Sequence, residues 1–425
     1  MFIDPIVGRF QEHAELVGLC DNSATRREFH QQRLVREYGG EPVKTYSDFE
    51  TMLNAAKPDT VIVCTPDYSH DEFIIKSLKH GCDVISEKPL TTTAEKCQAI
   101  FDAVECSGKT VRTTFNLRWS PGVSKVREII QSGTIGRVRH INFEYWLNTS
   151  HGADYFRRWH SQKDLSGGLL IHKSTHHFDL INWWLNAIPE KVFAFGDLVF
   201  YGKKNAIERG EESLTAYDRY TGATGAESDP FRLSLDEDET LTGLYKNAEF
   251  DSGYIRDRNV FRHDITIEDS MSVLVKYRTG EMLSYSLNAY CPVEGFRVTV
   301  SGDRGRIEYE ERHASHIITG SKQVGDAEAI HTMRLTLQPL FSEPRMIDIP
   351  VQDGGHGGGD PLIQEQMFSP YPPVDSIGRN AGHEQGAASL LIGAAANLSI
   401  ATAKPISINE IFDLKAEAKK LSDLS

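Results

Sequence analysis

Hydrophobic and polar positions follow two different patterns along the chain. Up to about residue 116, short apolar runs alternate with amphipathic stretches of helical spacing. The runs AELVGLCD (residues 14–21) and DTVIVCTP (59–66) each end in polar turn residues, which is typical of buried parallel strands. Repeated strand and helix units of this length predict a parallel, doubly wound α/β sheet.

Two of the amphipathic stretches carry clear helix boundaries. SDFETMLNAA (47–56) begins at a serine that can cap a helix N-terminus, and SHDEFIIKSLKHG (69–81) is closed by Gly81. A strand, a helix and a last strand then follow, predicted at CDVISEKP (82–89), TTTAEKCQAIFDAVECSG (91–108) and KTVRTTFN (109–116).

After about residue 120, apolar positions alternate with a period of two and are joined by glycine-containing turns. Strands are expected in HINFEYWL (140–147), KVFAFGDLVFYG (191–202), residues 269–290, residues 296–310 and MRLTLQPL (333–340). They predict a second α/β domain with an open, mainly antiparallel sheet, covered by one helix over residues 167–185. The expected domains are residues 1–119 and 120–425.

Three segments of unusual composition fall in the second domain. Residues 217–252 form an acidic insertion rich in Gly, Ser and Thr, which we expect to be a surface loop or lid. GGHGGGDP (354–361) predicts a flexible loop. GAASLLIGAAANLSIATAK (386–404) predicts a helix whose small residues allow close packing.

Composition and charge limit the functional classes. The 425 residues carry a formal net charge of −14, which disfavours a nucleic-acid binder or a protein that docks on an anionic membrane. No apolar run approaches about 18 residues, so we expect no transmembrane helix. The cysteines form no CxxC pair and resemble no disulfide framework. We therefore expect a cytoplasmic protein.

Candidate chemistry begins at Asp21, which ends the first predicted strand. In a dinucleotide-binding domain, an acid at this position accepts hydrogen bonds from the adenosine ribose and repels a 2′-phosphate, which favours NAD over NADP. The same carboxylate could equally cap the helix that follows.

The glycine turn that should accompany such an acid is absent. The chain starts at MFIDPIVGRF, which matches the second half of the helix expected after a G-x-G-x-x-G turn. Loss of the first strand would expose two strand edges and remove the phosphate site. Either the start is misassigned or the gene fragmentary, or the chain is a variant that no longer binds the cofactor normally.

SEKPL (86–90) ends another parallel strand, at the edge where open α/β sheets bind ligands. Lys88 could there stabilise charge that develops on a substrate oxygen, and Pro89 would fix its direction. A lysine at a strand end can also be merely solvated.

LLIHKSTHHFD (169–179) places His172 and His176 four residues apart in a stretch that otherwise predicts an apolar helix. Three interpretations stay open: acid–base chemistry by neutral imidazoles, a zinc site, or histidines hydrogen-bonded within the core. No HExxH glutamate accompanies the pair, so we expect no metal.

Further polar and aromatic side chains could shape a sugar-sized pocket, although each alone could be structural. We assign Asn116, which follows the last strand of the first domain, to the cofactor. The candidates for the substrate are Arg118, His151, Trp159, Lys173, Tyr254 and His356.

Together these stretches resemble the glucose–fructose oxidoreductase and inositol dehydrogenase (Gfo/Idh/MocA) family. The resemblance rests on VCTPDYSH (63–70), SEKPL, FNLRWSP (115–121) and GGLLIHKSTHHFD (167–179), and covers nearly the whole chain except its start. It implies a Rossmann-like dinucleotide-binding domain and an α/β domain whose open sheet commonly forms homo-oligomer contacts. It also implies hydride transfer between NAD(P) and a sugar, glycoside or polyol.

The same resemblance implies roles for single residues. Lys88 matches the EKP lysine that contacts the reacting oxygen, and His176 matches the usual acid–base histidine. His172 stands where the family has an aspartate, so we expect it to orient His176 or share its proton, and simple inositol dehydrogenation is in doubt. The nicotinamide side would be lined by Thr65, Pro66, His70 and Glu87, with Asp21 at the ribose.

Other functions fit the same residues. One is glycoside cleavage through transient oxidation with tightly held NAD, which would release free sugar without net NADH. Another is a sensor or scaffold that kept the fold but lost the cofactor. A third is a metal hydrolase that uses His172 and His176.

Overall fold

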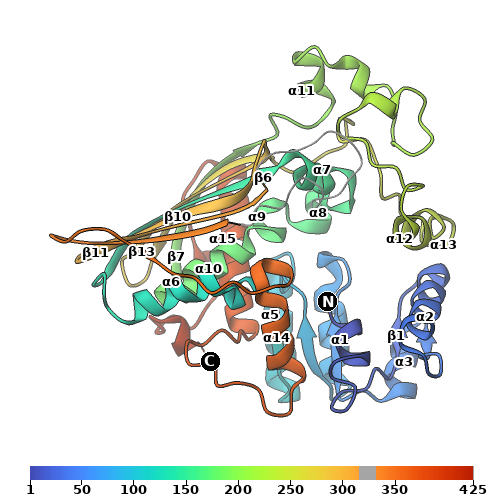
Figure 1. Cartoon of the computed structure of the whole chain (residues 1–425), viewed down its shortest axis with the longest axis horizontal. Helices are drawn as coiled ribbons and strands as arrows, with labels where there is room; N and C mark the ends of the chain where they lie inside the picture. Colours follow the sequence, from blue (N-terminus) through green and yellow to red (C-terminus); the bar gives the residue numbers. More distant parts are fainter. Residues whose placement is uncertain (315–331, 425) are drawn as a thin grey trace.

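The first domain holds two small parallel sheets in the computed structural model, which describes residues 1–314 and 332–424 (Figure 1). One sheet pairs β1 (Leu19–Cys20) with β2 (Thr45–Tyr46), and the other joins β3 (Thr60–Val63), β4 (Asp83–Ser86) and β5 (Val111–Thr113) in that order. The parallel pairing confirms the prediction. Within the described residues, the two sheets are not paired with each other.

The helices of this domain are α1 (Ile3–Val7), α2 (Ala24–Tyr38), α3 (Phe49–Ala56), α4 (His70–Lys79) and α5 (Ala94–Ser107). The predicted cap of α3 is wrong by one residue, because Asp48 and not Ser47 accepts a hydrogen bond from the Thr51 N–H, at 2.7 Å. A carboxylate also interacts favourably with the positive end of the helix dipole.

The second domain is built on a nine-stranded sheet in the order β13-β12-β11-β10-β6-β9-β8-β7-β14. Its strands are β6 (Val138–Asn148), β7 (Pro189–Asp197), β8 (Ser270–Tyr277), β9 (Met282–Cys291), β10 (Glu294–Gly302), β11 (Gly305–Ala314), β12 (Thr332–Pro339), β13 (Arg345–Ile347) and β14 (Ile406–Ser407). All neighbours run antiparallel except β6 and β9, so a mainly antiparallel sheet is confirmed.

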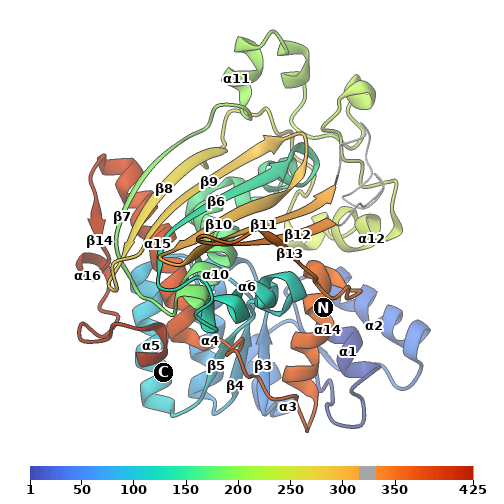
Figure 2. The same cartoon turned by 60° about the vertical axis from the view of Figure 1, so that its left-hand side comes forward.

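A helical layer of α6 (Pro121–Gln131), α10 (Thr175–Leu185) and α15 (His383–Thr402) lies between the large sheet and the first domain (Figures 1 and 2). The predicted small-residue helix is α15. A Cβ added at Gly393 would lie 2.4 Å from the Leu170 carbonyl oxygen, so this close approach requires glycine.

Two local predictions are wrong. Residues 167–185 do not form one helix, since α9 (Leu169–His172) ends before α10 begins and the Ser174 N–H bonds back to the Leu169 carbonyl at 2.8 Å. GGHGGGDP is not a free loop. It opens α14 (Gly355–Phe368), in which His356, Gly357 and Gly358 adopt left-handed φ angles of 52°, 65° and 86° before the regular turns start.

The acidic insertion forms short helices: η5 (Ala226–Ser228), α12 (Glu239–Leu241), the π-helical η6 (Thr242–Lys246) and α13 (Glu249–Ser252). Figure 1 places α12 and α13 beside α2 of the first domain. The remaining short elements are η1 (Asp67–Ser69), η2 (Asn116–Trp119), α7 (Thr149–Arg157), η3 (Trp159–Ser161), α8 (Lys163–Ser166), α11 (Lys203–Glu208), η4 (Glu212–Thr215), α16 (Ile408–Ile411) and η7 (Leu421–Asp423). In the described ranges, every helix is too short or too polar to cross a membrane.

Candidate active site

Lys88 lies where the two domains meet. It follows β4, and its Nζ donates a hydrogen bond to the carbonyl oxygen of His172 at 2.8 Å, at the end of α9. The Lys88–Pro89 peptide is cis. Burial lowers the pKa of Lys88, although the neighbouring carboxylates of Asp67 and Glu87 oppose that shift. The structure therefore brings the predicted lysine to the predicted histidine helix.

His172 has a carboxylate partner that the sequence analysis missed. Its Nδ1 lies 2.5 Å from Oδ2 of Asp67, and the side chains are only 13% and 5% exposed. Asp67 belongs to the first domain, in η1 just after β3, and His172 to the second. The signal was present in VCTPDYSH, where an acid follows a strand end, but nothing in the sequence pairs it with a residue 105 positions away.

Burial sets the charge state of this pair. It raises the pKa of Asp67 to about 7, although His70 and Lys88 oppose that shift. It also lowers the pKa of His172, and the positive charge of Lys88 adds to the effect. Asp67 and His172 are thus arranged to share one proton near neutral pH.

His176 lies in the first turn of α10 and is 3% exposed. Its Nδ1 has no hydrogen-bond partner in the part of the chain that the structure describes. Burial lowers its pKa, and Lys88 lowers it further, so the imidazole is held neutral. Because α9 ends at His172 and α10 begins at Thr175, His172 and His176 do not lie on one helix face. The prediction that they share a face is wrong.

Aromatic rings surround His172. Trp159 stacks on His160 with ring centroids 3.7 Å apart, and His160 meets His172 edge-on at 4.2 Å. Tyr155 contacts His172 at 5.4 Å and hydrogen-bonds His151 Nε2 at 3.0 Å. The structure thus brings Trp159 and His151 to the cluster and adds Tyr155 and His160, which the sequence analysis missed because their i, i+5 spacing fits no single helix face.

Two further predicted residues flank this cluster. Lys173 lies with its Nζ 5.2 Å from the Tyr145 ring centroid, and burial lowers its pKa to about 8. His151 Nδ1 lies 2.8 Å from Glu294, whose pKa is lowered to about 2 because the attraction of His151 and its hydrogen bond outweigh burial. Lys173 adds a second cation to the site beside Lys88.

The residues predicted to bind a dinucleotide lie at the carboxyl ends of β1, β3 and β4. Asp21 Oδ1 accepts a hydrogen bond from the Ser23 N–H at 2.7 Å, and within the described residues its Oδ2 makes none. A carboxylate oxygen left open at a strand end fits a ribose hydroxyl. Ser23, and not Asp21, caps α2 through its side chain.

Not every residue of that group can touch a ligand. His70 is 1% exposed, and its ring nitrogens contact the carbonyl oxygens of Pro89 and Thr65 at 2.8 and 2.7 Å. His70 therefore joins the segments that follow β3 and β4. This corrects the expectation that His70 contacts the cofactor. Pro66 is exposed, whereas Thr65 and Glu87 are partly buried beside it, and burial raises the pKa of Glu87.

Asn116 and His356 meet on the other side of His176. Asn116 Nδ2 lies 2.9 Å from His356 Nδ1 and donates to Asp360 Oδ1 at 3.2 Å, while its buried Oδ1 has no partner among described residues. The His356 ring lies 6.1 Å from that of His176. The start of α14 therefore closes this end of the site.

Arg118 is not a substrate residue, which corrects our expectation. It is fully buried and forms two 2.6 Å hydrogen bonds with Asp179 of α10, and its Nη1 donates to Gln385 of α15 at 2.7 Å. Burial raises the pKa of Asp179 to about 6, against the attraction of Arg118. The pair joins the end of the first domain to the helical layer.

Arg118→Met is expected to lower the free energy of unfolding by about 3 kcal/mol, because Asp179 would stay buried without its cation. Denaturant unfolding followed by circular dichroism measures this change. Arg139→Met is the matched control, since Arg139 pairs with Asp303 on the surface and should have little effect. Equal stability of the two variants would contradict a structural role for Arg118.

Tyr254 follows the acidic insertion, and its ring faces Arg26 of α2 at 5.8 Å. The charge of Arg158, which precedes Trp159, acts on both Tyr254 and His172, so a contact of Tyr254 with the substrate stays a prediction. Across residues 1–314 and 332–424, no group of three or more His, Cys, Asp or Glu side chains is arranged to hold a metal ion.

Comparison with known proteins gives matches over both domains. Residues 2–115 match the model of an oxidoreductase family NAD-binding Rossmann fold, and residues 127–408 match the C-terminal alpha/beta domain of the same family. The chain is 36% identical over 428 residues to the putative oxidoreductase YteT of Bacillus subtilis (strain 168), covering 98% of this chain and 96% of that protein.

More distant relatives have named activities. Levoglucosan dehydrogenase of Pseudarthrobacter phenanthrenivorans is 30% identical over 210 residues, which cover 45% of this chain and 53% of that protein. The WlbA dehydrogenase of Bordetella pertussis, solved in complex with NADH and UDP-GlcNAcA, superposes with a TM-score of 0.58 at 17% identity, covering 93% of this chain and 91% of that one. That likeness shows the shared fold.

Proposed function

Because the chain belongs to the Gfo/Idh/MocA family of NAD-binding oxidoreductases, we propose that it transfers hydride between nicotinamide and a hydroxyl or keto group of a sugar, glycoside or polyol. The observation that carries this proposal is the meeting of Lys88 and Asp67 from one domain with His172 and His176 from the other. A cation, a proton-sharing pair and a neutral imidazole are groups that can assist the removal of a proton from an alcohol during its oxidation.

Each of these groups has a distinct task in the proposed reaction. His176, held neutral by burial and by Lys88, accepts the proton of the substrate hydroxyl. The Lys88 ammonium stabilises the negative charge that grows on the same oxygen. Asp67 fixes His172 with its Nδ1 proton toward the carboxylate, so that Nε2 is left as an acceptor that orients or shares the transferred proton.

The cofactor supplies the hydride acceptor when it is bound, and several residues of this chain fit it. Asp21 would hold the ribose, and Thr65, Pro66, Glu87 and Asn116 would line the nicotinamide side. The orphaned Oδ1 of Asn116 offers a buried acceptor for an amide group. The carboxylate of Asp21 favours NAD over NADP.

The aromatic wall around His172 fits a sugar ring. Trp159 offers an apolar ring face, and Lys173 offers a hydrogen-bonding group at the edge. His151, whose ring nitrogens contact Glu294 and the Tyr155 hydroxyl, holds Tyr155 in this wall. We propose that these residues bind a glycoside or free sugar of the size that such relatives oxidise.

A panel of sugars, glycosides and polyols with NAD tests the proposal. NADH formation at 340 nm with at least one sugar or polyol would support it, and the absence of turnover and of NADH binding would overturn it. Product analysis distinguishes the transient-oxidation route, which releases free sugar without net NADH.

Asp67→Asn is expected to remove the acid limb of the pH profile. Asp67 must be ionised to accept the Nδ1 proton of His172, so kcat/KM for sugar oxidation should fall as pH drops through about 7 in the unmodified enzyme. The asparagine variant should lose this limb and about tenfold in kcat. Asp59→Asn, at an exposed position, is the control, and an unchanged limb in Asp67→Asn would contradict the assignment.

We also propose that the uncovered face of the large sheet forms homo-oligomer contacts. Along β8 the side chains alternate, with Val273 and Val275 buried and Leu274 55% exposed, and Met282 at the start of β9 is 52% exposed. Sedimentation velocity on the purified protein measures the oligomeric state.

A further inference from the structure

Residues 239–254, which we name the strap, reach from the second domain to helix α2 of the first (Figure 1). The Leu244 carbonyl accepts a hydrogen bond from Arg26 Nε at 2.9 Å. A Cβ added at Gly243 would lie 2.4 Å from the Phe29 ring, so the strap backbone packs directly on the helix. Glu239 lies 3.7 Å from Arg36 near the other end of α2.

The strap places a carboxylate at the N-terminus of α2. Oδ1 of Asp251 accepts a hydrogen bond from Ser23 Oγ at 2.8 Å, and Oδ2 accepts one from the Thr25 N–H at 2.8 Å. The hydrogen bond from the Thr25 amide lowers the pKa of Asp251, so the group is ionised at neutral pH. The donors that an anionic ligand would use at this helix end are thus already occupied.

Asp21 lies on the other side of the same serine. Its Oδ1 accepts the Ser23 N–H at 2.7 Å while Asp251 accepts the Ser23 hydroxyl, so two carboxylates flank one residue. In the proposed function, this strand end holds the adenosine ribose. The group that distinguishes NADP from NAD is a phosphate on the 2′ oxygen of that ribose.

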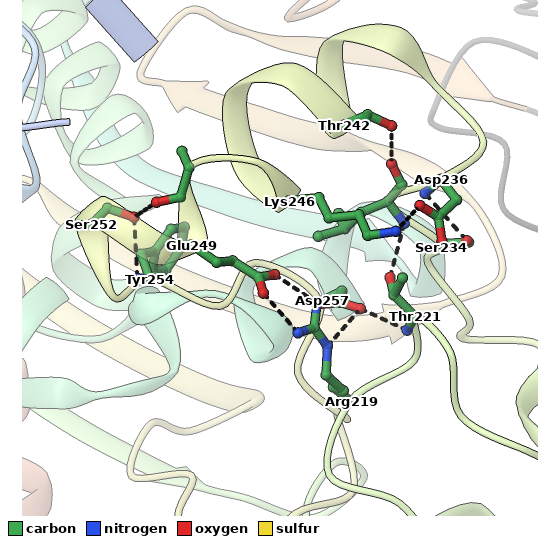
Figure 3. A network of polar contacts seen from close by, with 12 residues as sticks. Arg219, Thr221, Ser234, Asp236, Thr242, Lys246, Glu249, Ser252, Tyr254 and Asp257 are labelled. Carbon is green, nitrogen blue, oxygen red and sulfur yellow. Dashed lines mark hydrogen bonds and ion pairs between the residues drawn. The ribbon is translucent and has the colours of Figure 1, made fainter. Parts of the chain in front are cut away.

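Hydrogen bonds and ion pairs hold the residues on either side of Asp251 in the chain (Figure 3). Arg219 pairs with Glu249, two residues before Asp251, at 2.7 and 2.9 Å, and with Asp257 at 2.7 Å. Asp257 in turn accepts the Thr221 N–H at 2.7 Å. Because Glu249 and Asp257 bracket Asp251 in the chain, the carboxylate is anchored from both sides.

Polar atoms near the Tyr245 ring of the strap are buried but unpaired, which points to a ligand at this place. Within the described residues, Arg26 Nη2 and the Nε and Nη1 of Arg256 have no hydrogen-bond partner. Arg256 is 6% exposed, and its Nη2 pairs with Asp154 at 2.7 Å. Arg26 lies over the rings of Tyr245 and Tyr254 at 5.7 and 5.8 Å. Buried donors of this kind are normally satisfied, and the phosphate and ribose oxygens of a dinucleotide are acceptors.

We propose that Asp251 determines cofactor specificity: the strap holds its carboxylate beside Asp21 so that NAD is bound and the 2′-phosphate of NADP is excluded. This inference rests on the proposed function, because it assumes that a nicotinamide dinucleotide binds at Asp21. A 2′-phosphate carries nearly two negative charges at pH 7 and would meet two carboxylates at close range. Without the charge of Asp251, the Ser23 hydroxyl and Thr25 amide become donors for that phosphate.

Binding measurements on the full chain test the proposal without reference to turnover. NADH and NADPH are titrated by fluorescence, and 5′-AMP and 2′,5′-ADP by calorimetry, at 0.15 M salt. We expect the unmodified protein to bind NADH at least about tenfold more tightly than NADPH. Asp251→Asn should tighten NADPH binding about tenfold and change NADH binding less than about threefold.

Two further variants complete the test. Glu239→Gln removes one negative charge from the same strap at the other end of α2, and should leave the NADH to NADPH ratio unchanged. Asp251→Ser retains a hydroxyl acceptor and serves if the asparagine variant fails to fold, which thermal unfolding reports.

The outcomes separate this proposal from the one on which it rests. If NADH binds but Asp251→Asn and Asp251→Ser leave the ratio unchanged, or Glu239→Gln shifts it equally, Asp251 does not determine specificity and the proposed function stands. Tighter binding of NADPH than NADH by the unmodified protein also overturns the inference. If the folded protein binds none of the four ligands, both proposals are wrong.

Discussion

Replacing Lys88 with alanine is expected to lower kcat for sugar oxidation about a thousandfold, because the developing charge on the substrate oxygen loses its stabilising cation. The dissociation constant for NADH should change by less than about threefold, since Lys88 is directed at His172 and not at the Asp21 end. Steady-state kinetics with the best substrate of the panel, together with NADH titration, measures both quantities.

Lys79→Ala is the matched control for this variant. Lys79 ends α4 and is exposed, so its removal deletes the same charge without touching the site. If Lys88→Ala retains a near-normal rate, or if the two variants behave alike, Lys88 has no direct part in the reaction.

His176→Gln is expected to reduce kcat/KM for oxidation by about a thousandfold at pH 7, because glutamine fills a similar space but cannot accept a proton. The loss should shrink as pH rises, since hydroxide then takes over proton removal. Rate measurements from pH 6 to 10 give this dependence. Loss that is independent of pH would indicate that His176 supports the fold of α10 and does not exchange a proton.

An exposed histidine provides the comparison for His176→Gln. His80 follows α4 and is exposed, so His80→Gln should leave the pH profile unchanged. Thermal unfolding of both variants separates a damaged fold from a lost proton acceptor, because only His176 is buried.

Elements whose folding is determined locally were predictable from the sequence. The helices α4 and α5 follow from apolar spacing and from Gly81 and Gly108, which adopt left-handed φ angles of 85° and 64° where the helices stop. The helix α15 follows from a run of small residues and leucines, which favours a closely packed helix over a strand or a loop. In these segments, propensity, pattern and capping agree with the tertiary fold.

Contacts between distant segments were not predictable in this way. The sequence shows Asp67 as one acid after a strand, and only the docking of the two domains makes it the partner of His172. It shows Arg118 as a polar residue near a strand end, whereas the fold buries it against Asp179. The break between α9 and α10 follows from the bond of Ser174 back to Leu169, which has no signature in an apolar stretch.

The acidic insertion shows an intermediate case. Its composition predicts an exposed segment, and residues 217–252 are indeed short helices and turns near the surface. Composition does not reveal that one of its many acids, Asp251, meets the first turn of α2. Charge density along a sequence indicates solvent exposure, but the partner of a single carboxylate depends on the path of the backbone.

The division of the Asp67–His172 pair between two domains also constrains how this enzyme can be recombined. A hybrid that takes its cofactor domain from a relative without an acid at the position of Asp67 would leave His172 buried with no carboxylate. The converse hybrid would bury Asp67 without an imidazole. An exchange of these domains that is meant to change cofactor preference must therefore keep Asp67 and His172 together in the hybrid.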